Sequence, residues 1–420
     1  MNDQFTETTT TSWGSRITSS IKGIFLGLLM FFISFGVLYW NEGRIDLSKL
    51  AEKAIDISST SKASADTDKQ LISVNGVFSS NEMIGDSFLK KGNYISIKRN
   101  VEMYSWNEET STKSKTNTGG SETTETTYTY KKEWTSMPAD SADFKKPEDH
   151  FNPAKTINSN SVKVQNAKLG IYDIDTNSVS IPSHESISLN KDILILPAVA
   201  VKDSKEINPD VVKEITIDGE AQEKVKIIER KSLHLANEKY LFEGMGAITA
   251  PTVGDIRISY SVVPNPISNA TVFGQLNLAN NKIDPFYGPK DAKLYRVFKG
   301  TRETAISKMS TEHTIMTWVL RAVGFSLMWF GLMSLFAPLS VILDVLPMFG
   351  SIRRALSGFV TFVIALLLSI ITILVSMVIH NIIVLILIII GFVAGIVWYL
   401  KNKNKKLIKT DTSKPKASTE

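Results

Sequence analysis

The stretch that decides the fold is residues 21–44, IKGIFLGLLMFFISFGVLYWNEGR, where a long apolar run is followed by a short polar one. A helix rises about 1.5 Å per residue, so Ile21 to Trp40 is long enough to cross a hydrocarbon core of about 30 Å. Three more apolar runs of similar length lie near the other end of the chain, at residues 317–337, 355–379 and 382–400. The sequence therefore predicts four transmembrane helices, with one long polar segment between the first and the second.

The first apolar run has two readings, a cleaved signal peptide or a retained anchor. A cleavage site needs small residues at alternate positions, and residues 38–44 read LYWNEGR, so we expect a retained anchor. Another apolar run, Ile193 to Val201, has only nine residues and contains Pro197. It is too short to span a bilayer and is predicted to be a buried strand.

Basic residues beside the apolar runs set the expected orientation. They are Arg16 and Lys22 before the first run, Arg353 and Arg354 between the second and third, and Lys401, Lys403, Lys405, Lys406 and Lys409 after the last. Lysine and arginine near the ends of transmembrane helices favour the cytoplasmic side. The sequence thus predicts that residues 1–20, the 338–354 loop and the basic 401–420 tail are cytoplasmic. Residues 41–316 then form a domain in a lumen, a periplasm or the extracellular space.

The composition of this domain limits its chemistry. Residues 42–316 hold 35 Lys and Arg against 37 Asp and Glu, so the domain is slightly acidic. The chain has no cysteine, which excludes disulfides, thiol nucleophiles and cysteine-based zinc sites. No phosphate-binding loop or nucleophile-elbow serine stands in a usable context, and no histidines are paired at i, i+4 among His150, His184, His234, His313 and His380. The sequence therefore predicts no enzyme activity, no cofactor and no metal site.

Most of the domain shows the two-residue period of strands. The runs are residues 71–78, 94–106, 127–135, 161–174, 192–201, 212–217, 224–229, 239–242, 255–263 and 271–278. Short β-rich runs separated by turn residues are typical of a sandwich or a barrel, so we expect a β-rich (α+β) domain of that kind. Residues 110–126 are too polar to pack and are predicted to be the flexible tip of a long hairpin. A connecting helix is expected at residues 302–316.

The two strands of that hairpin carry aromatic residues at alternate positions. Glu102, Tyr104 and Trp106 share one face of the first strand, and the second presents Tyr128, Tyr130, Lys132 and Trp134. Paired across the hairpin, these side chains would form a ladder of aromatic contacts. The nearby lysines also fit a nucleic-acid platform, but the slightly acidic balance argues against it, so no nucleic-acid partner is expected.

Charged and aromatic residues gather at the outer boundary of the first two predicted helices. Glu42 ends the first helix, where the helix macrodipole disfavours an anion, so we expect a cationic partner, either Arg44 or Arg321. A Glu42–Arg321 pair would join the first span to the second, whereas the alternative is that Arg321 simply extends toward water. Trp40 and Trp318 fit an aromatic belt at the same boundary.

Several blocks of sequence match a known family in form and order. They are residues 34–44, 101–106, 128–134, 143–153, 254–260 and 317–324, with Asn41, Gly43, Glu102, Tyr104, Trp106, Tyr130, Trp134, Asp255 and Arg257 among their residues. These blocks resemble the transmembrane protein 43 family, also called LUMA. The resemblance implies one span, a large lumenal domain and three closing spans, which agrees with the hydropathy. It also implies a membrane organiser that self-associates, in the endoplasmic reticulum or nuclear envelope of a eukaryote or the inner membrane of a bacterium.

The expected function is therefore a non-enzymatic scaffold or sensor of membrane protein complexes. Its partners would be the lipid bilayer, other copies of the chain, and other membrane or exported proteins. Two alternatives stay open at this stage. A transporter or channel subunit would need a polar path through the helices, and the third and fourth apolar runs contain no charged residue. A membrane-bound hydrolase would need histidines and carboxylates that converge in the exported domain.

Overall fold

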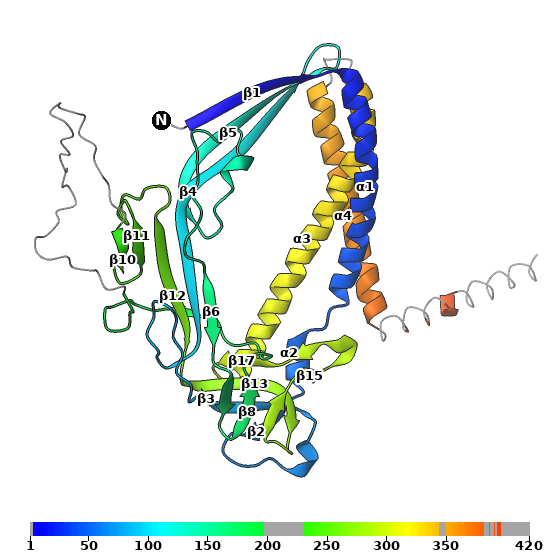
Figure 1. Cartoon of the computed structure of the whole chain (residues 1–420). Helices are drawn as coiled ribbons and strands as arrows, with labels where there is room; N and C mark the ends of the chain where they lie inside the picture. Colours follow the sequence, from blue (N-terminus) through cyan, green and yellow to red (C-terminus); the bar gives the residue numbers. More distant parts are fainter. Residues whose placement is uncertain are drawn as a thin grey trace, which may run out of the picture. The chain divides into compact units, whose positions relative to one another are not determined.

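The computed structural model describes residues 3–196, 231–343 and 350–381, together with residues 386, 390 and 393–395. The chain divides into two compact units (Figure 1). The β unit comprises Met1–Thr9, Asp46–Lys113 and Thr124–Thr311, and the helical unit comprises Thr10–Ile45, Ser114–Thr123 and Glu312–Glu420.

A closed five-stranded barrel lies in the β unit. Around the ring its strands are β3 (Leu71–Ser79), β7 (Asn166–Leu169), β8 (Tyr172–Asp175), β14 (Lys282–Asp284) and β13 (Ile267–Asn277). Each strand pairs with the next, and β13 pairs back with β3, which leaves the ring without a free edge. Closure of this kind removes the unpaired backbone groups of an open sheet. Two further strands, β2 (Ile55–Ser58) and β17 (Arg296–Lys299), pair with β3 and β13.

The barrel follows from the period of its strands. In β13 and β3 the paired residues Val272 and Val74 are both fully buried, and they join Ile174 and Ile283 in one apolar core. Because side chains alternate across a strand, this inward set leaves the intervening residues to face outward. The sequence-based expectation of a sandwich or a barrel is met by a barrel in this part of the domain.

A second sheet has the strand order β1-β5-β4-β12-β11-β10, with β6 paired to β4 and β9 paired to β12. These strands are β1 (Asp3–Thr11), β4 (Tyr94–Thr116), β5 (Glu122–Thr135), β6 (Asn160–Lys163), β9 (Glu185–Ser186), β10 (Lys231–Leu235), β11 (Leu241–Gly244) and β12 (Ile256–Pro264). Ile97 of β4 lies opposite Val262 of β12, and both belong to the core of this sheet.

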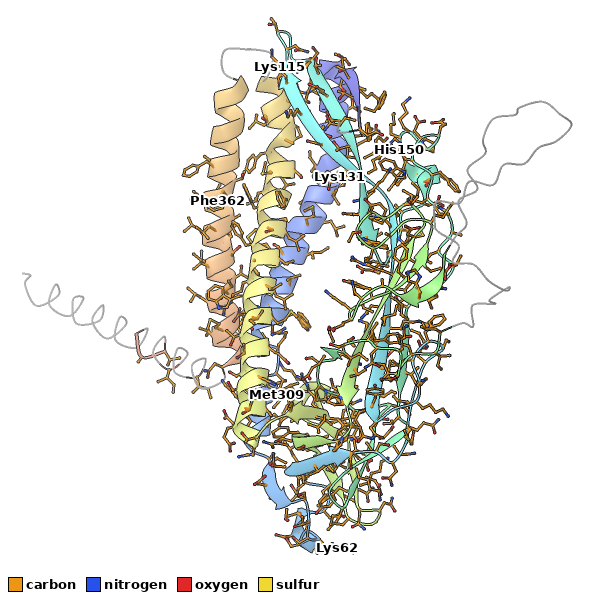
Figure 2. All side chains as sticks on the ribbon, turned by 90° about the vertical axis from the view of Figure 1, so that its left-hand side faces the viewer. Lys62, Lys115, Lys131, His150, Met309 and Phe362 are labelled. Atoms are coloured by element: carbon orange, nitrogen blue, oxygen red, sulfur yellow. The ribbon has the colours of Figure 1, made fainter. Side chains whose placement is uncertain are left out.

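Short elements complete the β unit. They are the helix α2 (Leu47–Ala51), the 3₁₀ turns η1 (Ala65–Thr67), η2 (Ser141–Asp143) and η3 (Pro289–Asp291), and the strand pair β15 (Phe286–Tyr287) and β16 (Lys293–Leu294). A third apolar cluster joins Ala51 of α2 to Phe273, Phe298, Ala305 and Met309. Figure 2 labels Met309 on the helix that follows.

The hairpin departs from its prediction. Strand β4 continues to Thr116 and β5 begins at Glu122, so only the residues between them form the turn. Most of residues 110–126, expected as a flexible tip, is therefore strand. Threonine favours strands even where a segment buries little apolar surface, and that preference outweighed the polar composition. The run 161–174 also proved to be three short strands, and β1 was not predicted.

Three helices form the described part of the helical unit: α1 (Trp13–Glu42), α3 (Arg302–Leu343) and α4 (Gly350–His380). Within the described residues, these three are long and apolar enough to cross a membrane. The connecting helix expected at 302–316 and the span expected at 317–337 are one continuous helix, α3. The predicted fourth span, residues 382–400, lies largely outside the described residues, as do the 401–420 tail and the strands predicted at 212–217 and 224–229.

Helices α1 and α3 approach each other closely at two glycines. A Cβ on Gly27 would lie 2.9 Å from the carbonyl oxygen of Gly331, and a Cβ on Gly331 would lie 2.8 Å from the nitrogen of Phe31. Small residues allow such backbone contact between membrane helices, where dispersion forces drive packing. Beyond this crossing, Leu38 of α1 and Met328 of α3 are fully buried in an apolar cluster that includes Ala365 of α4.

Candidate functional site at the C-terminal end of α1

Of the two cations considered as partners of Glu42, Arg321 is the one that binds its carboxylate. Arg321 Nε donates to Glu42 Oε1 at 2.8 Å, and Arg321 Nη2 donates to Oε2 at 2.9 Å. The Glu42 side chain is only 6% exposed and that of Arg321 is 20% exposed. A two-point bond of this kind fixes both the distance and the orientation of the two side chains. It therefore ties the last residue of α1 to the middle of α3.

Two neighbouring residues add bonds between the same helices. Asn41 Nδ2 donates to the carbonyl oxygen of Thr317 at 3.1 Å, and Arg44 Nη2 donates to the Thr317 hydroxyl and the His313 carbonyl oxygen, each at 3.3 Å. Asn41 Oδ1 and Arg44 Nε are buried without a hydrogen-bond partner among the described residues. The polar run after Trp40 thus binds α3 through Asn41, Glu42 and Arg44.

Helix α4 contacts the C-terminal end of α1 through His380. Its ring lies 4.6 Å from the ring of Tyr39, and Ser376 Oγ donates to the Tyr39 carbonyl oxygen at 3.1 Å. A Cβ on Gly43 would lie 2.3 Å from His380 Nε2. The absence of a side chain at Gly43 therefore makes room for the His380 ring where the ends of α1 and α4 lie close together.

Replacing Gly43 by alanine is expected to displace His380. Overpacking of this kind typically costs about 1–3 kcal/mol, so Gly43→Ala should lower the thermal midpoint of the detergent-solubilised protein. Gly36→Ala on the same helix is the matched control, because a Cβ at Gly36 meets nothing within 4 Å. Equal midpoints for the two variants would contradict the assigned contact.

The two tryptophans of this boundary remain largely exposed. Trp40 is 61% exposed and Trp318 is 64% exposed. The guanidinium carbon of Arg321 lies 4.9 Å from the centre of the Trp318 ring, so Trp318 covers one face of the ion pair. Their role as interfacial anchors stays a prediction.

In the β unit, four residues that the sequence analysis singled out form one cluster. Arg257 Nε donates to Glu102 Oε2 at 2.6 Å across the β12–β4 pair. The Arg257 guanidinium carbon lies 4.6 Å from the Trp134 ring, which is 5.4 Å from the ring of Tyr104. The predicted contact of aromatic side chains across the hairpin is therefore present at Tyr104 and Trp134.

Further along the hairpin, the aromatic residues surround a histidine. The ring of Tyr130 stacks on His150 at 3.6 Å, and Trp106 meets His150 edge-on at 4.6 Å. Lys132 Nζ lies 4.4 Å from the Trp106 ring. Both ring nitrogens of His150 lie within hydrogen-bond distance of oxygens, those of the Lys146 carbonyl and the Asp3 carboxylate.

Asp255 organises a turn before β12. Its buried carboxylate accepts hydrogen bonds from the backbone nitrogens of Met245 at 2.8 Å, Gly246 at 3.1 Å and Thr252 at 2.7 Å. Buried amides need such acceptors. The family-motif aspartate thus has a structural role in the described chain.

A buried network that the sequence analysis missed joins β4 and β12, the two strands in the middle of the second sheet. Asp86 Oδ2 accepts from Arg99 Nη1 at 2.7 Å and from the Tyr260 hydroxyl at 2.6 Å. Burial alone would raise the pKa of Asp86, but hydrogen bonds from Tyr260 and Asn160 and the Arg99 charge lower it overall. Arg99 and Tyr260 lie opposite each other on β4 and β12, whereas Asp86 comes from a loop whose sequence carries no comparable signal.

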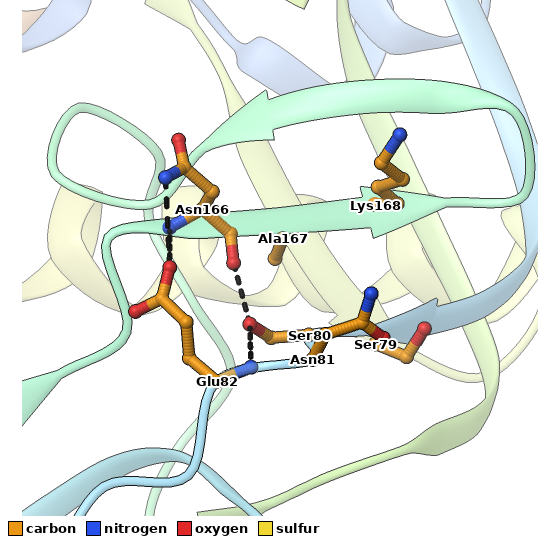
Figure 3. A pocket seen from close by; sticks show the side chains of 7 residues that line it. All are labelled: Ser79, Ser80, Asn81, Glu82, Asn166, Ala167 and Lys168. Atoms are coloured by element: carbon orange, nitrogen blue, oxygen red, sulfur yellow. Dashed lines mark hydrogen bonds between the residues drawn. The ribbon is translucent and has the colours of Figure 1, made fainter.

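A small depression on the barrel lies beside the turn that follows β3 (Figure 3). Its Glu82 carboxylate accepts from the backbone nitrogens of Gln165 at 2.9 Å and Asn166 at 3.0 Å, and these bonds lower the pKa of Glu82. Ser80 Oγ donates to the Asn166 carbonyl oxygen at 2.6 Å. The polar groups are therefore used in closing β3 against β7. Across the described ranges, no three His, Asp or Glu side chains are arranged to hold a metal ion.

Comparison with known proteins supports the sequence resemblance. The family model described as transmembrane protein 43 matches residues 103–382. Relatives named transmembrane protein 43 from Homo sapiens and Mus musculus are each 24% identical over 359 residues, covering 80% of this chain and 78% of theirs. The protein of that name from Rattus norvegicus is 23% identical over the same length. No solved structure matches this chain. The match extends over most of the β unit and onto α3 and α4, so the chain belongs to the transmembrane protein 43 family.

Proposed function

We propose that this membrane protein is a non-enzymatic scaffold or sensor that organises membrane protein complexes through an exported β unit. The observation that carries the proposal is the bonded joint at the C-terminal end of α1. The chain passes from the helical unit to the β unit after Ile45 and returns at Glu312. Arg44 and His313, each next to one of these passages, are hydrogen-bonded to each other.

Within the helical unit, this joint fixes two of the chain segments that lead to the β unit. Arg44, Asn41 and Glu42 bind α3, and His380 brings in α4, so the chain beside two of the five points at which it passes between the units, after Ile45 and before Glu312, is held within the helical unit.

The β unit also presents apolar side chains that suit protein partners. Phe151 is 69% exposed and Met137 is 84% exposed. The residue after Phe151 is held firmly, since Asn152 bonds Trp106 twice and also the carbonyl oxygen of Ala139. Exposed aromatic side chains on a well-held backbone are typical anchors of protein interfaces.

Several hydroxyl side chains of the helices form hydrogen bonds within their own helix. This arrangement does not favour the transporter alternative, which needs a polar path. The hydroxyls of Ser34, Thr361 and Thr372 each donate to a carbonyl oxygen of their own helix. Such bonds satisfy a hydroxyl without a water-filled path.

Site-specific photocrosslinking tests the proposal. A crosslinking residue at Phe151 in the full chain is expected to capture a membrane or exported protein, whereas one at exposed Lys168 should capture little. Co-purification of two differently tagged copies in mild detergent tests self-association. A strictly monomeric protein that crosslinks no protein from either position would overturn the scaffold assignment.

A further inference from the structure

The N-terminal end of α1 contacts the tip of the β4–β5 hairpin within the helical unit. Arg16 Nε lies 3.0 Å from Glu122 Oε2, and Arg16 Nη1 donates to the carbonyl oxygen of Gly120 at 2.5 Å. The Arg16 side chain is 9% exposed. A buried arginine needs a counter-charge and hydrogen-bond acceptors, and the hairpin tip supplies both for Arg16.

The turn of the hairpin is shaped to receive Trp13. Gly120 has a φ of +82°, and a Cβ there would lie 2.6 Å from Trp13 Cδ1. Asn117 holds the turn, since its backbone nitrogen donates to the Ser121 carbonyl oxygen at 2.7 Å and its Nδ2 donates to the Thr123 hydroxyl at 2.8 Å. On its other side, Trp13 Nε1 donates to the Val341 carbonyl oxygen at 3.0 Å. The indole is therefore enclosed by the turn and the end of α3.

The residues before Trp13 are bound in the same manner, within the β unit. Strand β1 pairs with β5, and its alternate side chains each meet a specific partner. Asp3 Oδ2 lies 2.9 Å from the nitrogen Nε2 of buried His150, the ring of Phe5 stacks on Tyr128 at 6.2 Å, and Glu7 Oε2 lies 2.7 Å from Lys145 Nζ. Asp3, Phe5 and Glu7 of β1 thus each have a specific partner in the β unit.

These contacts bear on the membrane topology. The charge pattern places residues 1–20 and 41–316 on opposite sides of the bilayer, but hydrogen bonds cannot form across a hydrocarbon core of about 30 Å. We propose that the start of α1 (residues 13–16) and the hairpin tip (residues 114–123) lie on the same side of the membrane. The proposal concerns the path of the chain and is independent of the scaffold function.

The hairpin is long enough to satisfy this arrangement while α1 spans the bilayer. Strand β4 has 23 residues, and at a rise of about 3.3 Å per residue it measures on the order of 75 Å, more than twice the hydrocarbon thickness. Residues 107–116 read NEETSTKSKT and have no apolar side chain for lipid. A hairpin that passes the plane of the membrane must therefore be surrounded by protein or water.

Because the chain has no cysteine, single introduced cysteines report the side directly. The positions are Gly14, where a Cβ meets nothing within 4 Å, and exposed Lys115 and Lys62, both labelled in Figure 2. Gly14→Cys, Lys115→Cys and Lys62→Cys are labelled with a membrane-impermeant maleimide in sealed vesicles of both orientations. The expected result is that Gly14→Cys and Lys115→Cys react from the same side.

Each labelling pattern decides the proposal. Reaction of positions 14 and 115 from one side and position 62 from the other supports it and shows that the hairpin passes the membrane plane. Reaction of all three from one side also supports it and shows that α1 does not cross. Reaction of positions 14 and 115 from opposite sides overturns it.

A pair of glycine variants tests the contact itself. Gly119 and Gly120 both have positive φ values, +85° and +82°, so alanine strains the backbone similarly at both, but only Gly120 faces Trp13. In the Lys115→Cys background, Gly120→Ala is expected to raise the labelling rate severalfold above that of Gly119→Ala. Equal rates would show that the indole is not seated in the turn.

Discussion

Arg321→Ala is expected to destabilise the helical unit more than any other single substitution at the joint between α1 and α3. Removal of one member of a buried ion pair leaves the other charge without compensation, which typically costs about 3–5 kcal/mol. Glu42 is nearly fully buried, whereas Arg321 is partly exposed, so we expect the lower end, about 3 kcal/mol. The measurement is the thermal midpoint of the full chain in detergent, followed by tryptophan fluorescence.

Two further variants separate the pair from a general effect of charge. Lys308→Ala removes an exposed cation from the same helix and should leave the midpoint nearly unchanged. The double reversal Glu42→Arg with Arg321→Glu restores opposite charges and should recover part of what either single reversal loses. A double reversal less stable than both single variants would show that the two side chains do not act as a pair.

Asp86→Ala is expected to have a comparable effect in the β unit. It leaves the Arg99 guanidinium, with an 11% exposed side chain, and the buried Tyr260 hydroxyl without their acceptor. The expected loss is about 3–5 kcal/mol in the free energy of unfolding, measured by chemical denaturation. Asp173→Ala is the control, because its ion pair with Lys168 is about half exposed and such pairs contribute about 0–1 kcal/mol. Equal losses would contradict the assigned network.

The same network predicts a pH dependence with a definite sign. The pKa of Asp86 is lower in the folded protein than its ordinary value. Its contribution is therefore fully present above the unfolded pKa of about 3.9 and is lost as the pH falls through the lower folded value. The stability difference between the wild type and Asp86→Asn should shrink below about pH 4. If this stability difference stayed constant from neutral pH down to this acid range, it would not come from the ionised Asp86 carboxylate.

The sequence predicted those features that depend on local period and on length. Apolar runs of about 20 residues identified α1, α3 and α4, because a bilayer sets the length of a helix that crosses it. Alternation at 94–106, 255–263 and 271–278 identified β4, β12 and β13. A cationic partner for Glu42 was also predictable, because a carboxylate at a helix C-terminus needs a cation, but the sequence left Arg44 and Arg321 as alternatives.

Features that depend on contacts between distant segments could not be predicted from the sequence of one segment. Strand β1 and the outer part of the hairpin bury few apolar residues, so their polar composition resembled a loop. Their strand form depends on cross-strand partners such as Phe5 and Tyr128, which are far apart in the sequence. Asp86 gave no signal for the same reason, since its burial comes from strands β4 and β12.

By itself, the sequence determined that this is a multi-pass membrane protein of the transmembrane protein 43 family with a large β-rich domain, because span length, strand period and motif order are properties of contiguous segments. Only the tertiary structure decided that the domain contains a closed barrel, that Gly43 makes room for His380, and that Trp13 and Arg16 bind the hairpin tip. Those features arise from contacts between distant segments, whose geometry a local pattern does not encode.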